Sequence, residues 1–295
     1  MALDLDGTLL DFEQKYNTDG VHVIRTIQTN GFTLNEVWAE FFAEHGFLVG
    51  LSLDGTRELH NCFRTDPQGG GTYDAVLRSA ALLKRYGVPY NILCVVTDAT
   101  ARRPRDVYEA LREHRYLQFI PCLDPMDGAR PGYSLTGESY RYFLDTTFAL
   151  YCRDLCGGNP VSIRSFDNYI AILLGCPPEN CAMNGHCSCN PTVEADGSVY
   201  PCDFYALDEW KLGNVTQNTF FEMIRSGNAR RFLESSSPIS EKCGRCRWFS
   251  LCRGGCRRDR HPTEENRFCE CFQYFFERNI DAMMELAAAY RNGRF

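Results

Sequence analysis

Cysteine is crowded into the C-terminal part of this chain, and no other feature restricts the fold and the chemistry as strongly. The chain has 295 residues and 16 cysteines, and ten of these fall between Cys181 and Cys271. The N-terminus shows neither the basic nor the apolar region of an export signal, so we expect a cytoplasmic, reducing location. A disulfide framework is therefore disfavoured, and metal ligation is the leading interpretation.

The spacing of eight cysteines is typical of iron–sulfur ligands. The pattern consists of a CxxxxxC pair, a single cysteine, a CxxCxxxxxCxxxC run and a last single cysteine: Cys181, Cys187, Cys202, Cys243, Cys246, Cys252, Cys256 and Cys269. Eight thiolates make two sets of four, and four thiolates hold one 4Fe-4S cluster. Thiolates also suit Zn²⁺, so a structural zinc domain stays open. Chain order alone would group the four cysteines of the CxxCxxxxxCxxxC run.

Composition indicates a folded protein and excludes some partners. Apolar residues make up 44% and charged residues 23% of the chain, and the net charge is −7. An acidic chain lacks the surplus Lys and Arg that bind phosphate, so we expect no nucleic-acid partner. No run approaches the roughly 18 apolar residues of a membrane span, so we expect no membrane partner.

The first half of the chain alternates predicted strands with amphipathic helices. Strands are expected at 22–29, 47–53, 90–97 and 116–122, with helices at 34–44, 72–86, 104–114 and 136–152. Such alternation predicts parallel βαβ units. After Gly157-Gly158-Asn159-Pro160 the pattern ends, which predicts domains at 1–160 and 161–295. In the second domain, 192–200 is a hairpin signal and a last helix is expected from about 268 to 289.

Several sequence words resemble the anaerobic sulfatase-maturating enzymes, a radical SAM family with a C-terminal SPASM domain. They are NGHCSCNPTVEADGSVYPCDFYALDEWKLGN, CGRCRWFSLCRGGCRRD, IQTNG from Ile27, FLVGLSLDG from Phe47 and QFIP from Gln118. The resemblance covers roughly residues 15 to 285. It implies an α/β fold, with an incomplete parallel (β/α) radical SAM partial barrel followed by a small cysteine-rich α+β SPASM domain. The implied reaction oxidises a Cys or Ser of a sulfatase to formylglycine.

The resemblance also implies how the eight cysteines divide between two auxiliary 4Fe-4S clusters. The first cluster would take Cys181, Cys187, Cys202 and Cys256, and the second Cys243, Cys246, Cys252 and Cys269. This division interleaves the two sets along the chain. Cys271 is the alternative to Cys269 as the last ligand.

Three further roles follow from the resemblance alone. Asp203 matches the general base that takes the substrate proton, although it could instead only orient the cysteine loop. Ser52 matches a SAM-binding position, and Gln28 matches a position on the substrate side. The implied partners are a sulfatase polypeptide with a CxPxR or SxPxR motif and an external electron donor.

The sequence also departs from the family. SAM and a third 4Fe-4S cluster are implied, but the CxxxCxxC loop that holds them is absent. We therefore expect an N-terminally truncated enzyme that is inactive alone. The alternatives are a radical SAM/SPASM enzyme for another peptide and a non-catalytic iron–sulfur electron-transfer or binding module. A DxDGT word at Asp4 matches haloacid dehalogenase-like phosphatases, but only three residues precede it, so that interpretation is disfavoured.

Overall fold

The chain folds into two compact units. The computed structural model describes residues 8–236, 240–260 and 263–294. One unit, the sheet unit, consists of Ala2–Cys122 and Arg130–Phe166. The other, the cysteine-rich unit, contains Leu123–Ala129 and Asp167–Phe295. The change of unit after residue 166 lies six residues beyond the predicted boundary at residue 160.

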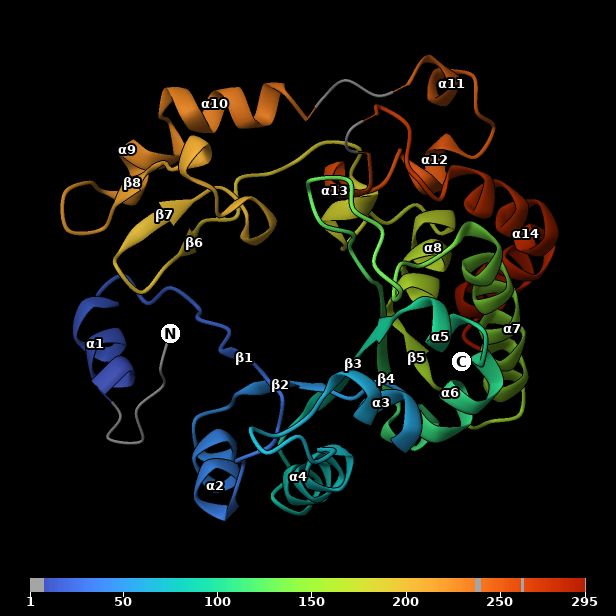
Figure 1. Cartoon of the computed structure of the whole chain (residues 1–295), viewed down its shortest axis with the longest axis horizontal. Coiled ribbons are helices and arrows are strands. Elements are labelled where there is room, and N and C mark those ends of the chain that lie inside the picture. The colour runs from blue at the N-terminus through green and yellow to red at the C-terminus, as the bar shows by residue number, and fades with distance from the viewer. Residues whose placement is uncertain (1–7, 237–239, 261–262, 295) are drawn as a thin grey trace. The chain divides into compact units, whose positions relative to one another are not determined.

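The sheet unit is built on five parallel strands in the order β1-β2-β3-β4-β5 (Figure 1). Their bounds are β1 Thr26–Thr29, β2 Leu48–Ser52, β3 Tyr90–Val96, β4 Tyr116–Pro121 and β5 Ser162–Ile163. Each strand pairs with the next one along the chain, as when Gln28 pairs with Gly50 and Leu93 with Gln118. This order and direction confirm the predicted α/β fold.

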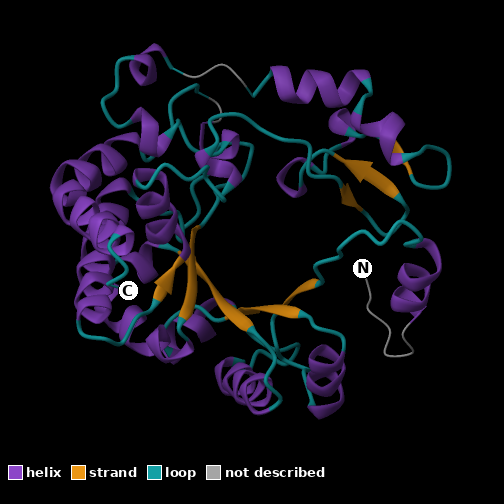
Figure 2. Cartoon of the chain, turned by 180° about the vertical axis from the view of Figure 1, so that it is seen from behind, coloured by secondary structure: helices purple, strands orange, loops and turns teal. Residues whose placement is uncertain are grey.

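The sheet unit contains helices both within and outside the predicted amphipathic stretches. They are α1 Thr8–Tyr16, α2 Glu36–Glu44, α3 Arg57–Phe63, α4 Tyr73–Arg85, α5 Asp98–Ala101, α6 Pro104–Leu111, the 3-10 turn η1 Arg112–His114 and α7 Gly137–Cys156. A side-chain N-cap fixes the start of four of them, α2, α3, α5 and α7; in α2 Asn35 accepts the Trp38 N–H, and in α7 Thr136 accepts the Ser139 N–H. In Figure 2 the strands form one curved sheet with helices α2 to α7 on its outer side.

Alternating side chains give the sheet two different faces. Val49, Leu51 and Ile92 are fully buried on the helix-covered face, where apolar strand residues gain most from burial. The intervening residues, including Gln28, Ser52 and Gln118, lie on the other face. The helix-covered face is therefore the core, and the other face carries polar groups.

Four elements of the sheet unit were not predicted: β5, α1, α3 and α5. Strand β5 has only two residues and so shows no alternation, and α3 and α5 have seven and four residues, whereas α1 is as long as the predicted α2. The DxDGT word begins at Asp4, outside the described residues, and its last residue, Thr8, is the first residue of α1.

The cysteine-rich unit combines a small sheet with short helices and one long helix. The predicted hairpin is confirmed as β6 Thr192–Val193 and β7 Ser198–Tyr200, and an unpredicted third strand, β8 Gly213–Asn214, pairs with β7. The short elements are η2 Cys181–Met183, η3 Asp203–Tyr205, η4 Asp208–Trp210, α9 Phe220–Ile224, α10 Gly227–Glu234, α11 Glu241–Gly244, α12 Phe249–Cys252 and α13 Arg257–Arg260. The long helix is α14, Cys269–Arg291, and α8, Arg164–Leu173, runs across the boundary between the units.

The loop 123–129 belongs to the cysteine-rich unit through polar contacts of Asp124. Arg258 donates to its backbone oxygen at 2.9 Å, and Arg267 forms an ion pair with its carboxylate at 2.8 Å. Arg267 also pairs with Asp259 at 3.2 Å. These contacts are distant in sequence, so sequence reasoning did not separate the loop from the first domain. Within the described residues, no helix is both long and apolar enough to cross a membrane.

Candidate metal centres

A first cavity in the cysteine-rich unit gathers one complete set of predicted ligands. It has an empty volume of about 550 Å³. Its lining includes Cys181 from η2, Cys187 and Cys202 from loops, and Cys256 just before α13. These four residues span 75 positions of sequence, so the fold, and not local spacing, brings them together.

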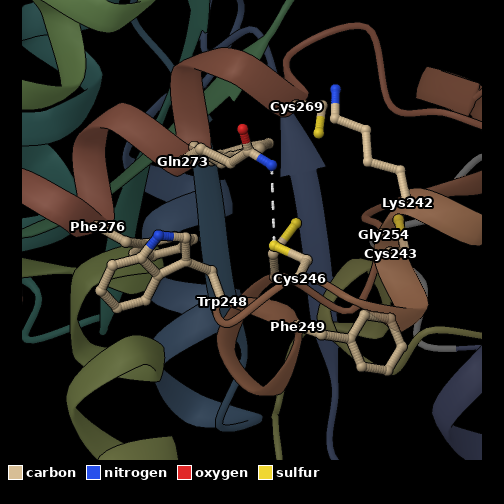
Figure 3. A pocket seen from close by; sticks show the side chains of 11 residues that line it. Lys242, Cys243, Cys246, Trp248, Phe249, Gly254, Cys269, Gln273 and Phe276 are labelled. Carbon is tan, nitrogen blue, oxygen red and sulfur yellow. Dashed lines mark hydrogen bonds between the residues drawn. The ribbon is translucent and has the colours of Figure 1, made fainter.

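A second cavity gathers the other set. Its empty volume is about 330 Å³, and its cysteines are Cys243, Cys246, Cys252 and Cys269. Figure 3 shows the sulfur atoms of Cys243, Cys246 and Cys269 facing a shared space beside Trp248 and Phe276. The dashed line marks the Gln273 amide, which donates to the Cys246 sulfur at 3.8 Å.

A left-handed turn separates the two sets where they are adjacent in sequence. Arg253, Gly254 and Gly255 have φ values of 48°, 85° and 71°. Glycine adopts this conformation without the steric cost that a side chain brings. The turn directs Cys252 into the second cavity and Cys256, four residues later, into the first. The two cavities thus divide the cysteines as the family resemblance implied.

An aromatic cluster supports the first cavity. Tyr205, Trp210 and Phe232 are buried together, and Cys187 and Cys202 pack against them. The Arg257 guanidinium lies 4.7 Å from the Tyr205 ring centroid and 4.9 Å from that of Trp210. Cation–π contacts of this kind fix the arginine beside the cavity, whose lining also includes Arg260.

Burial favours the protonated form of several predicted ligand thiols. Burial raises the pKa of Cys202, Cys256 and Cys269 to about 12 and that of Cys252 to about 11. Such thiols are poor nucleophiles. A bound cationic centre would supply the charge that keeps them deprotonated. These thiols are therefore unsuited to nucleophilic catalysis, and they would need a bound cationic centre to act as thiolate ligands.

The cysteine sets are not arranged around a single point among the described residues. A tetrahedral zinc site holds four sulfur atoms about 2.3 Å from one point. Among the residues that the structure describes, no group of three or more His, Cys, Asp or Glu is arranged to hold one metal ion. Four thiolates are the ligand set of one 4Fe-4S cluster, and each cavity is lined by four cysteines.

The neighbouring cysteines lie elsewhere. Cys189 packs against the core of Val199, Leu212, Met223 and Ala229. Cys271 is 5% exposed, and only Cys269 of the two lines the second cavity. In the sheet unit, Cys94 and Cys122 are buried in the core. The cavity geometry therefore favours Cys269 as the last ligand.

Asp203 lines the first cavity directly after Cys202. Its carboxylate Oδ1 accepts the Phe204 backbone N–H at 3.0 Å and the Cys202 thiol at 3.3 Å. The carboxylate is otherwise exposed. These contacts are compatible with both roles considered for Asp203, since one oxygen orients the loop while the carboxylate stays accessible to a substrate.

Gln28 and Ser52 lie on one face of the sheet unit, at the C-terminal ends of β1 and β2. Gln28 pairs with Gly50, two residues before Ser52, so both side chains leave the sheet on the same side. A Cβ atom at Gly50 would lie 3.2 Å from Gln28 Cγ. On this face Gln118 also accepts a hydrogen bond from Arg164 at 3.1 Å. The C-terminal ends of parallel strands are where barrel ligands bind.

Two residues near the cavities were missed in the sequence. Tyr205 lines the first cavity, and burial raises its pKa to about 12, with the thiols of Cys256 and Cys187 adding to the increase. Gln273 lines the second. Each stands three or four residues after a ligand cysteine, but spacing alone does not indicate where a side chain points.

Comparison with known proteins identifies relatives of the whole chain. Residues 181–247 match the SPASM family, an iron–sulfur cluster-binding domain. A cysteine-type anaerobic sulfatase-maturating enzyme of Clostridium novyi (strain NT) is 45% identical over 302 residues, which cover 99% of this chain and 81% of that protein. A serine-type anaerobic sulfatase-maturating enzyme of Bacteroides thetaiotaomicron is 30% identical, with 91% of this chain and 70% of that protein covered.

A solved structure matches the fold closely. The structure described as "Native anSMEcpe with bound AdoMet and Cp18Cys peptide" superposes with a TM-score of 0.94 at 42% identity. The match covers 98% of this chain and 82% of that one. It includes both the parallel sheet and the cysteine-rich unit, as the coverage requires.

Proposed function

The chain belongs to the anaerobic sulfatase-maturating enzymes, a radical SAM family, and we propose that it serves the oxidation of a sulfatase cysteine to formylglycine with two auxiliary 4Fe-4S clusters. The observation that carries the proposal is the division of eight cysteines between two cavities, four in each. The substrate would be a sulfatase polypeptide with a CxPxR motif, and an external protein would supply electrons.

A cysteine is favoured over a serine as the target residue. The chain is 45% and 42% identical to cysteine-type enzymes of two Clostridium species, and 30% identical to serine-type enzymes. Since a site that binds a thiol differs from one that binds a hydroxyl, the higher identity supports the cysteine substrate. The alternative is a serine substrate, which an SxPxR peptide assayed beside the CxPxR peptide would distinguish.

When bound, SAM and the iron–sulfur clusters supply the radical and the electron path of the oxidation. The protein's own part is to hold these groups and to move one proton. Asp203 would accept the proton of the substrate thiol on a carboxylate oxygen, while the Phe204 N–H keeps the carboxylate in place. Once Cys202 is a thiolate ligand it has no S–H to donate, so Asp203 loses that competing donor.

Gln28 and Ser52 are proposed for the binding steps. Ser52 would contact SAM and Gln28 the substrate side, because both extend from the C-terminal ends of parallel strands. These 295 residues contain no CxxxCxxC spacing. We therefore expect this chain by itself to hold the two auxiliary clusters without cleaving SAM, which is the behaviour of an iron–sulfur electron-transfer module.

The experiment joins a CxxxCxxC-containing segment of a relative to this chain and compares Asp203→Asn with the unmodified chimaera. If Asp203 is the base, formylglycine formation on a CxPxR peptide falls by roughly 10² to 10⁴. Iron content and SAM cleavage stay unchanged. If Asp203 only orients the loop, iron content falls together with activity. Full peptide oxidation by the variant would reject the catalytic role.

A further inference from the structure

The lining of the first cavity includes a buried phenol, the side chain of Tyr205. Tyr205 is 4% exposed, and its hydroxyl oxygen has no hydrogen bond within the described part of the chain. Buried polar groups nearly always have a partner, since an unpaired one loses its bonds to water without compensation. The hydroxyl therefore indicates a group that the protein atoms do not supply.

The surrounding residues fix the Tyr205 side chain. Tyr205 ends the turn η3 that follows Cys202, and its backbone N–H donates to the Cys202 oxygen at 2.9 Å. Its ring lies edge-to-face against Phe232 at 5.3 Å and Trp210 at 6.3 Å. Arg257 lies 4.7 Å from the ring centroid. The ring thus has a fixed position in the wall of the first cavity.

We propose that the Tyr205 hydroxyl donates a hydrogen bond to a sulfur atom of the cluster in the first cavity, an inference that rests on the proposed function. Cys187 and Cys202 of that cavity pack against the same aromatic cluster. A phenol is protonated at neutral pH and is therefore a donor. Tyr205 is a positioning residue, because it acts on the cluster and not on the substrate.

The hydrogen bond would set the reduction potential of this cluster. Reduction adds negative charge to the cluster, and a donor to sulfur stabilises that charge, so it raises the potential. The cluster in the first cavity would therefore be reduced more readily with Tyr205 than with phenylalanine at this position. The second cavity has its own donor in Gln273 and does not involve Tyr205.

The test compares Tyr205→Phe with the unmodified 295-residue chain after anaerobic reconstitution with iron and sulfide. Iron content and the midpoint potentials of both clusters are measured by EPR-monitored titration. We expect unchanged iron, one potential shifted to a more negative value and the other potential unchanged. Tyr200→Phe is the matched control, since Tyr200 is 8% exposed and lines neither cavity; it should shift neither potential.

Unchanged potentials in an iron-replete Tyr205→Phe chain would overturn the inference and leave the proposed function standing. An unmodified chain that binds no iron would instead refute the proposed function. If the variant folds poorly, the unmodified protein is produced with tyrosine that carries deuterium on the two ring carbons next to the hydroxyl-bearing carbon. Electron–nuclear double resonance of the reduced clusters should then detect a coupled deuteron, and its absence would reject the proposed contact.

Discussion

Gly255→Ala should destabilise the cysteine-rich unit and remove both clusters. Gly255 has φ of 71°, and a Cβ atom there would lie 2.2 Å from the Asn266 amide nitrogen. The left-handed conformation costs an alanine about 1–2 kcal/mol. Moving Asn266 also breaks its bonds to Gly254 O at 3.3 Å and from Phe268 N at 2.8 Å, at about 1 kcal/mol each. The sum is roughly 3–4 kcal/mol, a large share of a typical domain's ~5–15 kcal/mol.

The assay is urea unfolding of the reconstituted chain under anaerobic conditions, followed by intrinsic fluorescence and combined with iron analysis. Gly227→Ala is the control, because Gly227 is the first residue of α10 and a Cβ atom there meets nothing within 4 Å. That control should change the free energy of unfolding by less than about 1 kcal/mol. Wild-type stability and full iron content in Gly255→Ala would refute the idea that this turn separates the two ligand sets.

Two further variants test single contacts. Gln273→Leu removes the amide that donates to the Cys246 sulfur. In an EPR-monitored titration it should lower the midpoint potential of the cluster in the second cavity, the potential that Tyr205→Phe leaves unchanged. A shift in the potential of the cluster in the first cavity would contradict the assignment. Burial opposes ionisation of Asp98, but bonds from Arg102 and Thr136 outweigh it and hold its pKa at about 2, below the roughly 3.9 of an unfolded chain. Its stabilisation is therefore complete above about pH 4 and is lost as the pH falls towards 2. The free energy of unfolding from urea titrations should fall over that window by about 1–2 kcal/mol more in the unmodified chain than in Asp98→Asn, and an equal fall in both would exclude the effect.

Sequence reasoning predicted the elements that have enough residues to show a period. Strands β1 to β4 and helices α2, α4, α6 and α7 all lie within or near their predicted ranges. Strands β5 and β8 have two residues each, too few for alternation. They exist because neighbouring strands offer hydrogen bonds, which is tertiary information.

The candidate site shows the same division between local and long-range information. The eight cysteines are recognisable from their spacing, but spacing groups Cys252 with Cys256. The left-handed turn at Arg253–Gly255 directs these two cysteines into different cavities. The family resemblance implied this division of the ligands, whereas chain order did not. Tyr205 and Gln273 could be identified only from the folded structure, because the sequence does not show which side chains point into a cavity.

Iron analysis of paired cysteine variants tests the two-cluster account most directly. The unmodified reconstituted chain should hold about eight irons, and Cys187→Ala/Cys256→Ala about four, because both cysteines belong to the first cavity. Cys252→Ala/Cys256→Ala should hold almost none, since it removes one ligand from each cavity. About four irons in Cys252→Ala/Cys256→Ala would contradict the account, because the two cysteines would then serve a single cluster.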